Sequence, residues 1–305
     1  MRFIFCADPF SINRPDSMYE DEVSAVKGLN LEYSCISFED LVEQHDVARA
    51  VRKVEPSVEI ETGIYRGWML KPEAYTRLYE ALVERNIFLI NTPSAYKHCH
   101  HLPESYAVIE CSTPQSVWIK AGADVSMDEI MGILQPFGSK PIIVKDFVKS
   151  RKHEWTEACF IPSAADRQTV ERVVKRFLVL QGEDLNEGLV FREFVEFEPL
   201  TTHSKSGMPL TKEYRLFFLD RQIIFSAEYW EEGDYSNVVP PVDSFLEIAK
   251  KVQSRFFTMD IARRVDGWWM IVELGDGQVA GLSGKIDLKA FYQVLAEYVE
   301  RNVCD

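Results

Sequence analysis

The sequence lacks a long hydrophobic run. No stretch approaches the ~20 apolar residues that a membrane-spanning helix needs. The first apolar run, from Phe3 to Ala7, ends at Asp8, before the hydrophobic core of a signal peptide is complete. We therefore expect a cytoplasmic protein with no membrane partner, in which these first residues form a buried strand.

Basic residues are also in short supply. The chain has 34 Lys and Arg residues against 48 Asp and Glu residues, which gives a formal net charge of −14. Such a charge repels phosphate backbones and anionic lipids unless basic residues are concentrated locally. Duplex nucleic acid is therefore excluded as the default partner.

Paired cysteines and internal repeats are missing as well. The six cysteines are scattered and form no C-x-x-C pair, so we expect reduced thiols rather than a disulfide framework. No repeat or low-complexity segment occurs, which excludes a solenoid. The 305 residues, 46% of them hydrophobic, are typical of about two globular domains.

The first ninety residues alternate short apolar runs with helical patterns. Strands that alternate with helices favour parallel pairing with right-handed crossovers, so residues 1–93 are predicted to form a small parallel α/β domain. The expected strands cover residues 3–7, 31–35, 58–61 and 88–90, and the expected helices cover residues 19–27, a segment opened by Ser37, and residues 72–85.

The remainder, residues 94–305, divides near residue 188, after which long aromatic strands dominate, into a smaller and a larger lobe. In the smaller lobe, residues 94–188, we expect strands at 117–120 and 142–147, a helix capped by Ser126, and a helix at 168–180. In the larger lobe, residues 189–305, we expect strands at 189–197, 214–219, 223–229, 256–264 and 268–274, a loop at 201–207, and helices at 244–256 and after Asp287.

One hairpin pattern predicts a specific geometry. Asp266-Gly267 stands between two β-rich runs, which is the strongest short hairpin signal. A two-residue turn pairs Val265 with Trp268, and counting outward places Asp260 opposite Glu273. Carboxylates directly opposed on one face repel each other, and Mg²⁺ is typically held by one or two carboxylates together with substrate phosphates. A solvent-facing acidic pair, or a register shifted by a longer turn, is the alternative.

The acidic chain carries one basic segment. It contains Lys140, Lys145, Lys149, Arg151 and Lys152. Lys145 ends an apolar strand, so its ammonium group is held in place as a point charge for a phosphate. A solvated basic loop would show the same spacing. Combined with the paired acids, however, the segment describes half of a nucleotide site, with cations for the phosphates and acids for the metal.

The order of these features resembles the ATP-grasp superfamily over essentially the whole chain. A small α/β domain is followed by a strand ending in Lys145, a strand with the sequence Phe191-Arg192-Glu193-Phe194-Val195, a strand with Glu213-Tyr214-Arg215, and then Asp260 and Glu273. The resemblance implies an ATP-grasp fold, in which a small N-terminal parallel α/β domain precedes two α+β lobes that clamp ATP.

The resemblance also implies roles for individual residues. Lys145 matches the strand lysine that touches the nucleotide phosphates, and the hinge residues Glu193, Phe194 and Val195 match the segment whose backbone faces the adenine. Arg215 matches an arginine aimed at the transferred phosphate. Asp260 and Glu273 match two metal-binding acids. Phosphoryl transfer depends on positioning and charge neutralisation, which these residue types supply.

The chain departs from the family pattern in three places. The segment 147–152 replaces the glycine-rich phosphate loop, so Lys149 and its basic neighbours are expected to contact the phosphates there. This departure resembles a divergent clade, for which Arg192 in the hinge strand is suitable as a cofactor-binding residue. The usual third metal ligand, an Asn, is missing, and Asp276 or Gln278 is expected to replace it. The family's earlier lysine is also missing.

His98-Cys99-His100-His101 occupies the region of that missing lysine. His98 and His101 are one helical turn apart, but zinc sites normally gather four ligands from separated segments. We therefore favour a polar cap or a substrate contact over a metal site.

The function implied by the resemblance is that of an ATP- and Mg²⁺-dependent ligase. Such an enzyme activates a carboxylate, on a small molecule or a peptide, as an acyl phosphate that an amine-type nucleophile attacks. Two alternatives stay open: an ATP-dependent phosphotransferase on the same fold, and a non-catalytic nucleotide-binding protein, which the loss of the glycine-rich loop makes plausible.

Overall fold

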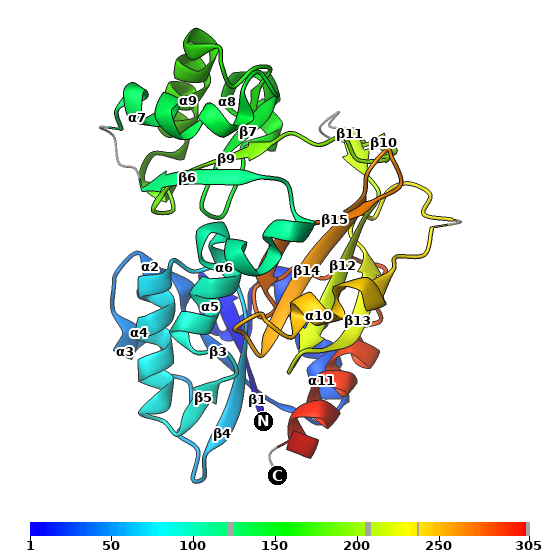
Figure 1. Ribbon diagram of the computed structural model, residues 1–305. Helices are drawn as coiled ribbons and strands as arrows, with labels where there is room; N and C mark the ends of the chain where they lie inside the picture. Colours follow the sequence, from blue (N-terminus) through cyan, green and yellow to red (C-terminus); the bar gives the residue numbers. More distant parts are fainter. Residues whose placement is uncertain (121–124, 205–208, 237, 303–305) are drawn as a thin grey trace.

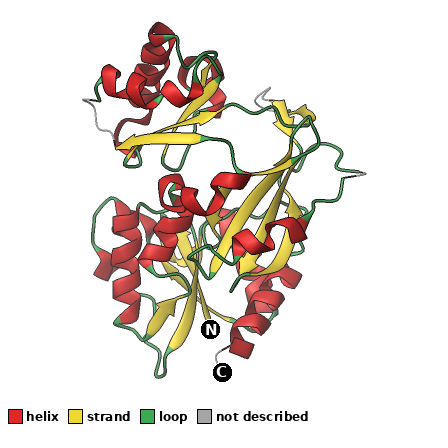
Figure 2. Cartoon of the chain, in the orientation of Figure 1, coloured by secondary structure: helices red, strands yellow, loops and turns green. Residues whose placement is uncertain are grey.

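A computed structural model describes residues 1–120, 125–204, 209–236 and 238–302. The chain forms an N-terminal domain, a smaller lobe that stands above it in Figure 1, and a larger lobe beside both. Each part is built around its own β-sheet with helices against it (Figure 2).

The N-terminal domain has one mixed sheet. Strand β1 pairs in parallel with β3 and β4, and β4 pairs in parallel with β5, as the alternating pattern predicts. The short strand β2 is unexpected and pairs antiparallel with the end of β1. Its residues are mostly polar and lie at the sheet edge, so they carry no strand pattern. The elements are β1 (Arg2–Asp8), β2 (Ser11–Pro15), η1 (Ser17–Tyr19), α1 (Glu20–Gly28), β3 (Glu32–Ile36), α2 (Phe38–Val42), α3 (Val47–Ala50), β4 (Glu61–Arg66), α4 (Pro72–Val83) and β5 (Ile87–Leu89). The strand expected at 58–61 therefore begins only at Glu61.

Two helices connect the N-terminal domain to the smaller lobe. They are α5 (Pro93–His100) and α6 (Leu102–Ile109), followed by the short helix η2 (Glu110–Ser112). Thr92 caps α5 by accepting a hydrogen bond from the Ala95 backbone, and Pro93 occupies the first helical position, where its missing N–H costs nothing. The predicted domain boundary after residue 93 thus lies at the start of a helix.

The smaller lobe is a four-stranded antiparallel sheet in the order β6-β9-β7-β8. One face packs its apolar side chains, such as Val144 and Phe191, against α7 and α9. Side chains alternate between faces along a strand, so Lys145 and Arg192 project from the opposite face. The elements are β6 (Ser116–Lys120), α7 (Met127–Ile133), η3 (Gln135–Phe137), β7 (Ile142–Asp146), η4 (Lys152–Glu154), α8 (Trp155–Ala158), β8 (Phe160–Ile161), α9 (Arg167–Gln181), η5 (Gly182–Asp184) and β9 (Gly188–Glu193).

The larger lobe contains a four-stranded antiparallel sheet in the order β13-β12-β14-β15. The helix expected at 244–256 is shorter, because Phe256 already starts β14 as a fully buried strand residue. The predicted loop at 201–207 starts inside β10, and its residues 205–207 lie outside the described residues. The elements are β10 (Pro199–Thr202), β11 (Pro209–Thr211), β12 (Glu213–Leu219), β13 (Gln222–Glu228), η6 (Val242–Phe245), α10 (Leu246–Ala249), β14 (Phe256–Arg263), β15 (Trp269–Asp276) and α11 (Leu288–Asn302).

The β14–β15 hairpin has the predicted central register but not the predicted turn. Asp260 lies opposite Glu273, as expected, yet Arg263 pairs with Trp269 and the backbone N–H of Arg264 donates to the Trp268 carbonyl at 2.8 Å. The turn therefore contains three residues and ends at Gly267, whose φ of 92° favours glycine. The pairing of Val265 with Trp268 was wrong.

A β-bulge restores the register further along the hairpin. Ile261 pairs with Ile271 whereas Asp260 pairs with Glu273, so Val272 is one extra residue in β15. A bulge of this kind commonly re-aims side chains next to a functional site. The three-residue turn shifts the pairing by one residue, and the bulge shifts it back. A count that starts from a two-residue turn therefore still pairs Asp260 with Glu273.

One face of the larger sheet changes character along its length. At one end Phe217, Leu219 and Phe256 pack in a core shared with β1 and with α11. At the other end the same face carries Arg215 and Asp260. The sheet thus joins the N-terminal domain through its apolar end and presents its charged end toward the smaller lobe.

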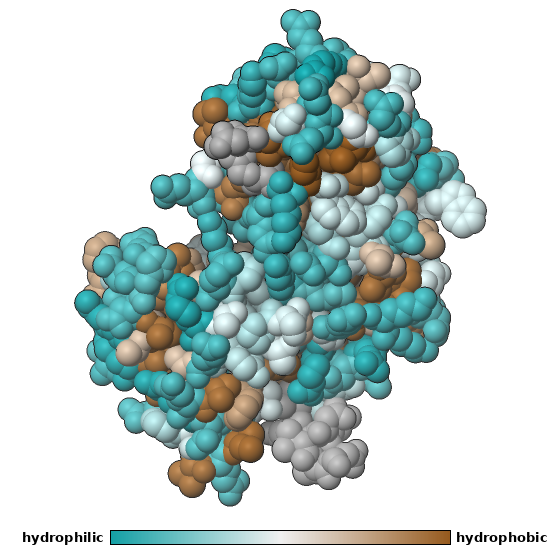
Figure 3. Space-filling model, turned by 60° about the vertical axis from the view of Figure 1, so that its left-hand side comes forward, coloured by the Kyte–Doolittle hydropathy of each residue, from teal (hydrophilic) through white to brown (hydrophobic). Residues whose placement is uncertain are grey.

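The visible surface in Figure 3 is mainly hydrophilic, with apolar side chains in separate patches. No helix within the described ranges is long and apolar enough to cross a bilayer. The described cysteines are unpaired thiols, and all of them are buried except Cys111.

The buried Asn91 side chain gives a stability prediction for the join between domains. Its Nδ2 donates to the Phe256 carbonyl and to Asp276 Oδ2, both at 2.6 Å, and its Oδ1 accepts from the Phe256 backbone at 3.0 Å. Removing these partners leaves buried polar groups unsatisfied, so Asn91→Ala should lower the free energy of unfolding by about 3 kcal/mol. Urea denaturation measures this loss. Ser24→Ala, which removes one hydrogen bond on an exposed helix, is the control and should change stability by less than about 0.5 kcal/mol.

Candidate functional site

The centre of the candidate site is the pair Asp260 and Glu273. They face each other on β14 and β15, but Arg215 on β12 lies directly opposite Asp260 and neutralises it. Arg215 donates from Nε to Asp260 Oδ1 at 2.8 Å and from Nη2 to Oδ2 at 2.7 Å. Because Asp260 is only 2% exposed, this two-point ion pair is shielded from water and holds both groups in a fixed orientation.

Arg215 has two further contacts that define its position. Its Nη1 donates to the Gly281 carbonyl at 3.1 Å, and its guanidinium carbon lies 4.6 Å from the centroid of the Tyr229 ring. Burial acts to lower the pKa of Arg215, but Asp260 outweighs it and raises the pKa. The guanidinium therefore stays charged and is held from three sides.

Lys145 approaches the acidic pair from the smaller lobe. It lies near the end of β7, is 6% exposed, and its Nζ is 3.9 Å from Glu273 Oε2. Burial lowers the pKa of the Lys145 ammonium, and the Glu273 carboxylate opposes that shift. The structure thus brings together four of the predicted residues, Lys145, Arg215, Asp260 and Glu273, from four different strands.

Glu213, Tyr229 and Lys152 complete the cluster. Lys152 belongs to the predicted basic segment, whereas Glu213 and Tyr229 were not predicted as site residues. Glu213 precedes Arg215 by two residues and so lies on the same face of β12; the spacing alone could have identified it. Burial raises the pKa of Glu213, and Lys152 opposes the shift. Burial lowers the pKa of Lys152, but Glu213 and Glu273 outweigh it and raise the pKa. Part of the Lys152 side chain reaches solvent, while its ammonium group lies within the field of the acidic cluster.

The segment that replaces the glycine-rich loop is a short, braced turn. Buried Asp146 accepts hydrogen bonds from the backbones of Val148 and Lys149 and, at 2.7 Å, from Gln181 Nε2. An Asp that binds the backbone two and three residues ahead stabilises a tight turn. The side chain of Lys149 is exposed beyond this turn. Asp146 was not predicted as a functional residue.

The hinge residues Glu193, Phe194 and Val195 line a pocket of about 590 Å³ together with Thr113 and Met270. Lys145, Asp260 and Glu273 do not line this pocket, so it is separate from the charged cluster. Glu193 is also bound to Lys140, with Nζ and Oε1 2.8 Å apart.

Phe194 packs on the other side of the hinge against two rings. Its centroid lies 5.1 Å from that of Phe160 and 5.7 Å from that of Trp155. Phe160 pairs with Ile143, which shares a sheet face with Lys145. The aromatic cluster of Trp155, Phe160 and Phe194 therefore lies on the same face of the smaller lobe as the buried lysine.

The guanidinium group of Arg192 makes hydrogen bonds within the protein. Its Nη1 donates to the carbonyl of Val272, the extra residue of the bulge, and its Nη2 donates to Thr113 Oγ1 at 2.6 Å and to the Ile271 carbonyl at 3.1 Å. Burial lowers the pKa of Arg192 to about 10. Arg192 thus braces β15 just before Glu273, and the bulge provides the carbonyl that it binds.

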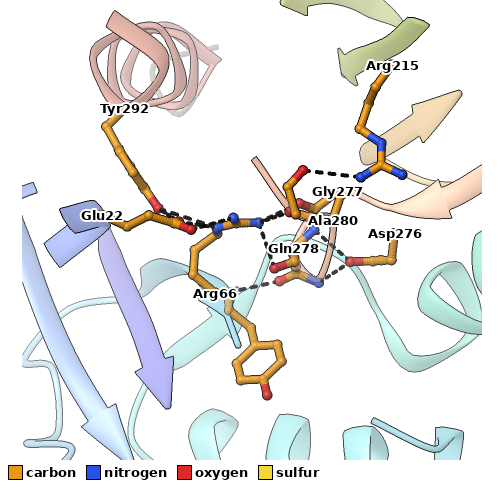
Figure 4. A network of polar contacts seen from close by, with 10 residues as sticks. Glu22, Arg66, Arg215, Asp276, Gly277, Gln278, Ala280 and Tyr292 are labelled. Carbon is orange, nitrogen blue, oxygen red and sulfur yellow. Dashed lines mark hydrogen bonds and ion pairs between the residues drawn. The ribbon is translucent and has the colours of Figure 1, made fainter. Parts of the chain in front are cut away.

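The structure does not bring Asp276 and Gln278 to the acidic pair. Asp276 lies opposite Phe257, three residues from Asp260 along β14, and is fully buried. Gln278 accepts from the Tyr65 backbone at 3.1 Å through Oε1 and donates from Nε2 to the Tyr75 hydroxyl at 2.7 Å. Their side chains dock the larger lobe on the N-terminal domain (Figure 4), so the expectation that either one supplies a third metal ligand is not retained.

The histidine cluster is buried in neutral form. His98 and His100 lie on α5, and His101 ends that helix. Burial lowers the pKa of His100 to about 3, and the neighbouring His101 acts in the same direction. His100 stacks on Tyr96 at 5.0 Å between centroids. No group of three or more His, Cys, Asp or Glu side chains placed to hold a metal occurs among the residues that the structure describes.

The acidic pair nevertheless suits a magnesium ion whose other ligands are substrate phosphates. Mg²⁺ is usually bound by one or two carboxylates, with substrate phosphates and water as the remaining ligands. The Glu273 side chain is 39% exposed, and each Asp260 oxygen keeps a second lone pair beside its bond to Arg215. Asp260 and Glu273 are therefore the residues that would hold the ion.

Two α+β lobes that enclose a buried lysine, an arginine and an opposed carboxylate pair define an ATP-grasp protein. The sequence of residues 131–295, more than half of the chain, matches the family described as "ATP-grasp domain, R2K clade family 3". The chain belongs to this family, and the predicted ATP-grasp fold is confirmed.

Comparison with solved structures agrees. The structure described as "RimK domain protein ATP-grasp from Sphaerobacter thermophilus DSM 20745" is similar to this chain, with a TM-score of 0.60 and 12% sequence identity. The match covers 98% of this chain and 99% of that one. The D-cycloserine synthetase DcsG has a TM-score of 0.58 and 13% identity over 98% and 99% of the two chains. The ATP-grasp ligase PsnB with a minimal precursor has a TM-score of 0.58 and 14% identity over 97% and 98%. Identities this low show a shared fold. A comparison with curated protein sequences found no match.

The burial of the acidic pair predicts unequal effects on stability. Asp260→Asn leaves the buried Arg215 without its full counter-charge, so the free energy of unfolding should fall by about 3 kcal/mol. Glu273→Gln changes a partly exposed carboxylate and should cost less than about 1 kcal/mol. Urea denaturation of both variants checks the difference, and equal losses would contradict the assigned Arg215–Asp260 pair.

Asp276 gives a prediction for pH. Burial raises its pKa from 3.8 to about 6, although bonds from Asn91 and Gln278 oppose the shift. A raised carboxyl pKa stabilises the fold below the unfolded pKa, and this contribution is lost as the pH rises through about 6. Asp276→Asn removes the titration, so the wild type should lose stability relative to the variant from about pH 4.5 to about pH 7. Denaturation at both pH values measures it, and a constant difference would reject the raised pKa.

Proposed function

We propose that the protein is an ATP- and Mg²⁺-dependent ligase that activates a carboxylate as an acyl phosphate for attack by an amine-type nucleophile. The observation that carries the proposal is the convergence of Lys145, Arg215, Asp260 and Glu273 from both lobes on one site, in which the Glu273 side chain is partly exposed. Family membership and the similarity to ligase folds support it.

The charges suit phosphoryl transfer. This reaction needs a positioned nucleotide and cations around the transferred phosphoryl group more than it needs a protein nucleophile. Lys145, Lys149 and Lys152 are proposed to bind the nucleotide phosphates, and Asp260 with Glu273 to hold Mg²⁺. The ion, when bound, neutralises phosphate charge. Arg215 is proposed to stabilise the negative charge that develops on the transferred group.

The adenine is proposed to lie beside the hinge backbone, against the aromatic cluster of Trp155, Phe160 and Phe194. This cluster lies on the same sheet face as Lys145, so one extended nucleotide can reach both. Arg192 is proposed to act indirectly, because its contacts hold the carbonyls of Ile271 and Val272 that precede Glu273.

The substrates are proposed to be a small-molecule or peptide carboxylate and an amine nucleophile. Among the similar folds, one ligase is described in complex with a precursor peptide and another is a D-cycloserine synthetase. The protein is proposed to work in the cytoplasm, where ATP and Mg²⁺ are supplied.

The test is ATP turnover in the presence of a trapping amine. The assay contains ATP, Mg²⁺, hydroxylamine and a panel of carboxylic acids and of peptides with a free carboxylate. We expect ADP release coupled to hydroxamate formation. Lys145→Met and Glu273→Gln should lower the rate about 100-fold or more, because each removes charge from the transferred phosphate or its metal. Lys175→Met, which breaks only an exposed ion pair on α9, is the matched control and should keep the wild-type rate.

The other outcomes separate the alternatives. A stable phosphorylated product without hydroxamate would replace the ligase with a phosphotransferase. A shift in melting temperature with ATP and Mg²⁺, without ADP release across the whole panel, would replace it with a non-catalytic nucleotide-binding protein.

A further inference from the structure

Arg66, at the end of β4 in the N-terminal domain, is 1% exposed and makes an unusually complete set of contacts. Its Nε and Nη2 donate to the two oxygens of Glu22 at 2.9 and 3.2 Å. Tyr292 of α11 donates to the same carboxylate and accepts from Arg66 Nε at 3.3 Å. Glu22 therefore balances the buried charge, and Arg66 joins the first and last helices of the fold.

The remaining nitrogen of Arg66 binds the segment that follows β15. Its Nη1 donates to the carbonyls of Gly277, Gln278 and Ala280, each at 3.0 Å. Figure 4 shows the guanidinium between this segment and the Glu22–Tyr292 pair. Only a planar guanidinium has enough fixed donors to serve the carboxylate and the carbonyls together.

The next carbonyl of the same segment belongs to the candidate site. Gly281 accepts from Arg215 Nη1 at 3.1 Å, while Nε and Nη2 of Arg215 bind Asp260. Figure 4 shows Arg215 reaching this segment from the side opposite Arg66. The Arg215 guanidinium is therefore oriented by its own sheet on one side and by a segment anchored to the N-terminal domain on the other.

We propose that Arg66 is a positioning residue for Arg215, acting through the carbonyls of residues 277–281. The inference rests on the proposed function for its effect on rate, but its effect on Arg215 is independent of any reaction. Without the three bonds from Arg66 the segment keeps its contacts through Gly277, Gln278 and Val279, but the Gly281 carbonyl is less restrained and Arg215 is less well oriented. The N-terminal domain then contributes to catalysis without touching the nucleotide.

The kinetic test compares Arg66→Lys and Arg66→Met with the wild type. Both variants should lower kcat about tenfold or more, because a small displacement of a group that acts on the transition state is costly. Affinity for an ATP analogue should change less than about twofold, since Lys145 and the hinge are not linked to Arg66. Arg66→Lys keeps the charge beside Glu22, so it separates the loss of carbonyl contacts from the loss of an ion pair.

A second measurement follows Arg215 directly. The Nε–H resonance of Arg215, assigned by its absence in Arg215→Lys, should move in both Arg66 variants. Arg2→Met, which breaks the largely buried ion pair with Glu61 in the same domain, is the matched control and should leave both kcat and the resonance unchanged. Tyr292→Phe removes one contact of Arg66 and should cause a smaller change in the same direction, so it replaces the Arg66 variants if they do not fold.

Arg66→Lys with wild-type kcat and an unmoved Arg215 resonance would overturn the positioning role. An equal loss of kcat in Arg2→Met would also overturn it, because the effect would then be one of general stability. If the wild type shows no turnover with any substrate, the proposed function fails, and the resonance alone decides whether Arg66 positions Arg215.

Discussion

Two carboxylates directly opposed on neighbouring strands, Asp260 and Glu273, place the main constraint on this structure. Their repulsion has to be balanced by opposite charges nearby. Arg215 on the adjacent strand neutralises the buried member, and Lys145 from the other lobe approaches the more exposed one. Burial acts to raise the pKa of Glu273, but Lys145 and Lys152 outweigh it and lower the pKa. Both lobes therefore contribute charged side chains to the site, and the carboxylates of the larger lobe are balanced in part by lysines of the smaller lobe.

The N-terminal domain is part of the same arrangement. The larger sheet continues beyond its charged end into an apolar core shared with β1 and α11. Asn91, Arg66 and Gln278 add buried hydrogen bonds across this join. Polar groups inside a join of this kind are costly unless each is satisfied, so they specify one docking geometry. That geometry places the segment 277–281 between the N-terminal domain and Arg215.

The pairing of Asp260 with Glu273 was predictable from the sequence, although the two-residue turn from which it was counted is not present. The turn at Gly267 holds three residues instead of two, and a bulge at Val272 restores the count. Turn length and bulges depend on local backbone geometry, which a strand pattern does not contain. The bulge also has a long-range reason, because the freed Val272 carbonyl accepts from Arg192 in the other lobe. Asp276 and Gln278 were expected to replace the missing third ligand because they follow Glu273 closely in the chain, but their side chains bind Asn91, Tyr65 and Tyr75.

The sequence by itself determined the features that depend on spacing along one strand or helix. These are the alternating N-terminal layer, the lysine at the end of an apolar strand, the caps at Ser37 and Ser126, and the pairing of Asp260 with Glu273. Tertiary structure alone decided which distant groups share a buried environment: the Arg215–Asp260 ion pair, the approach of Lys152 to Glu213, and the contacts of Arg66 with residues more than two hundred positions away. Hydrogen-bonding partners of buried polar groups are chosen by the packing of whole elements, and no local pattern in the chain records that choice.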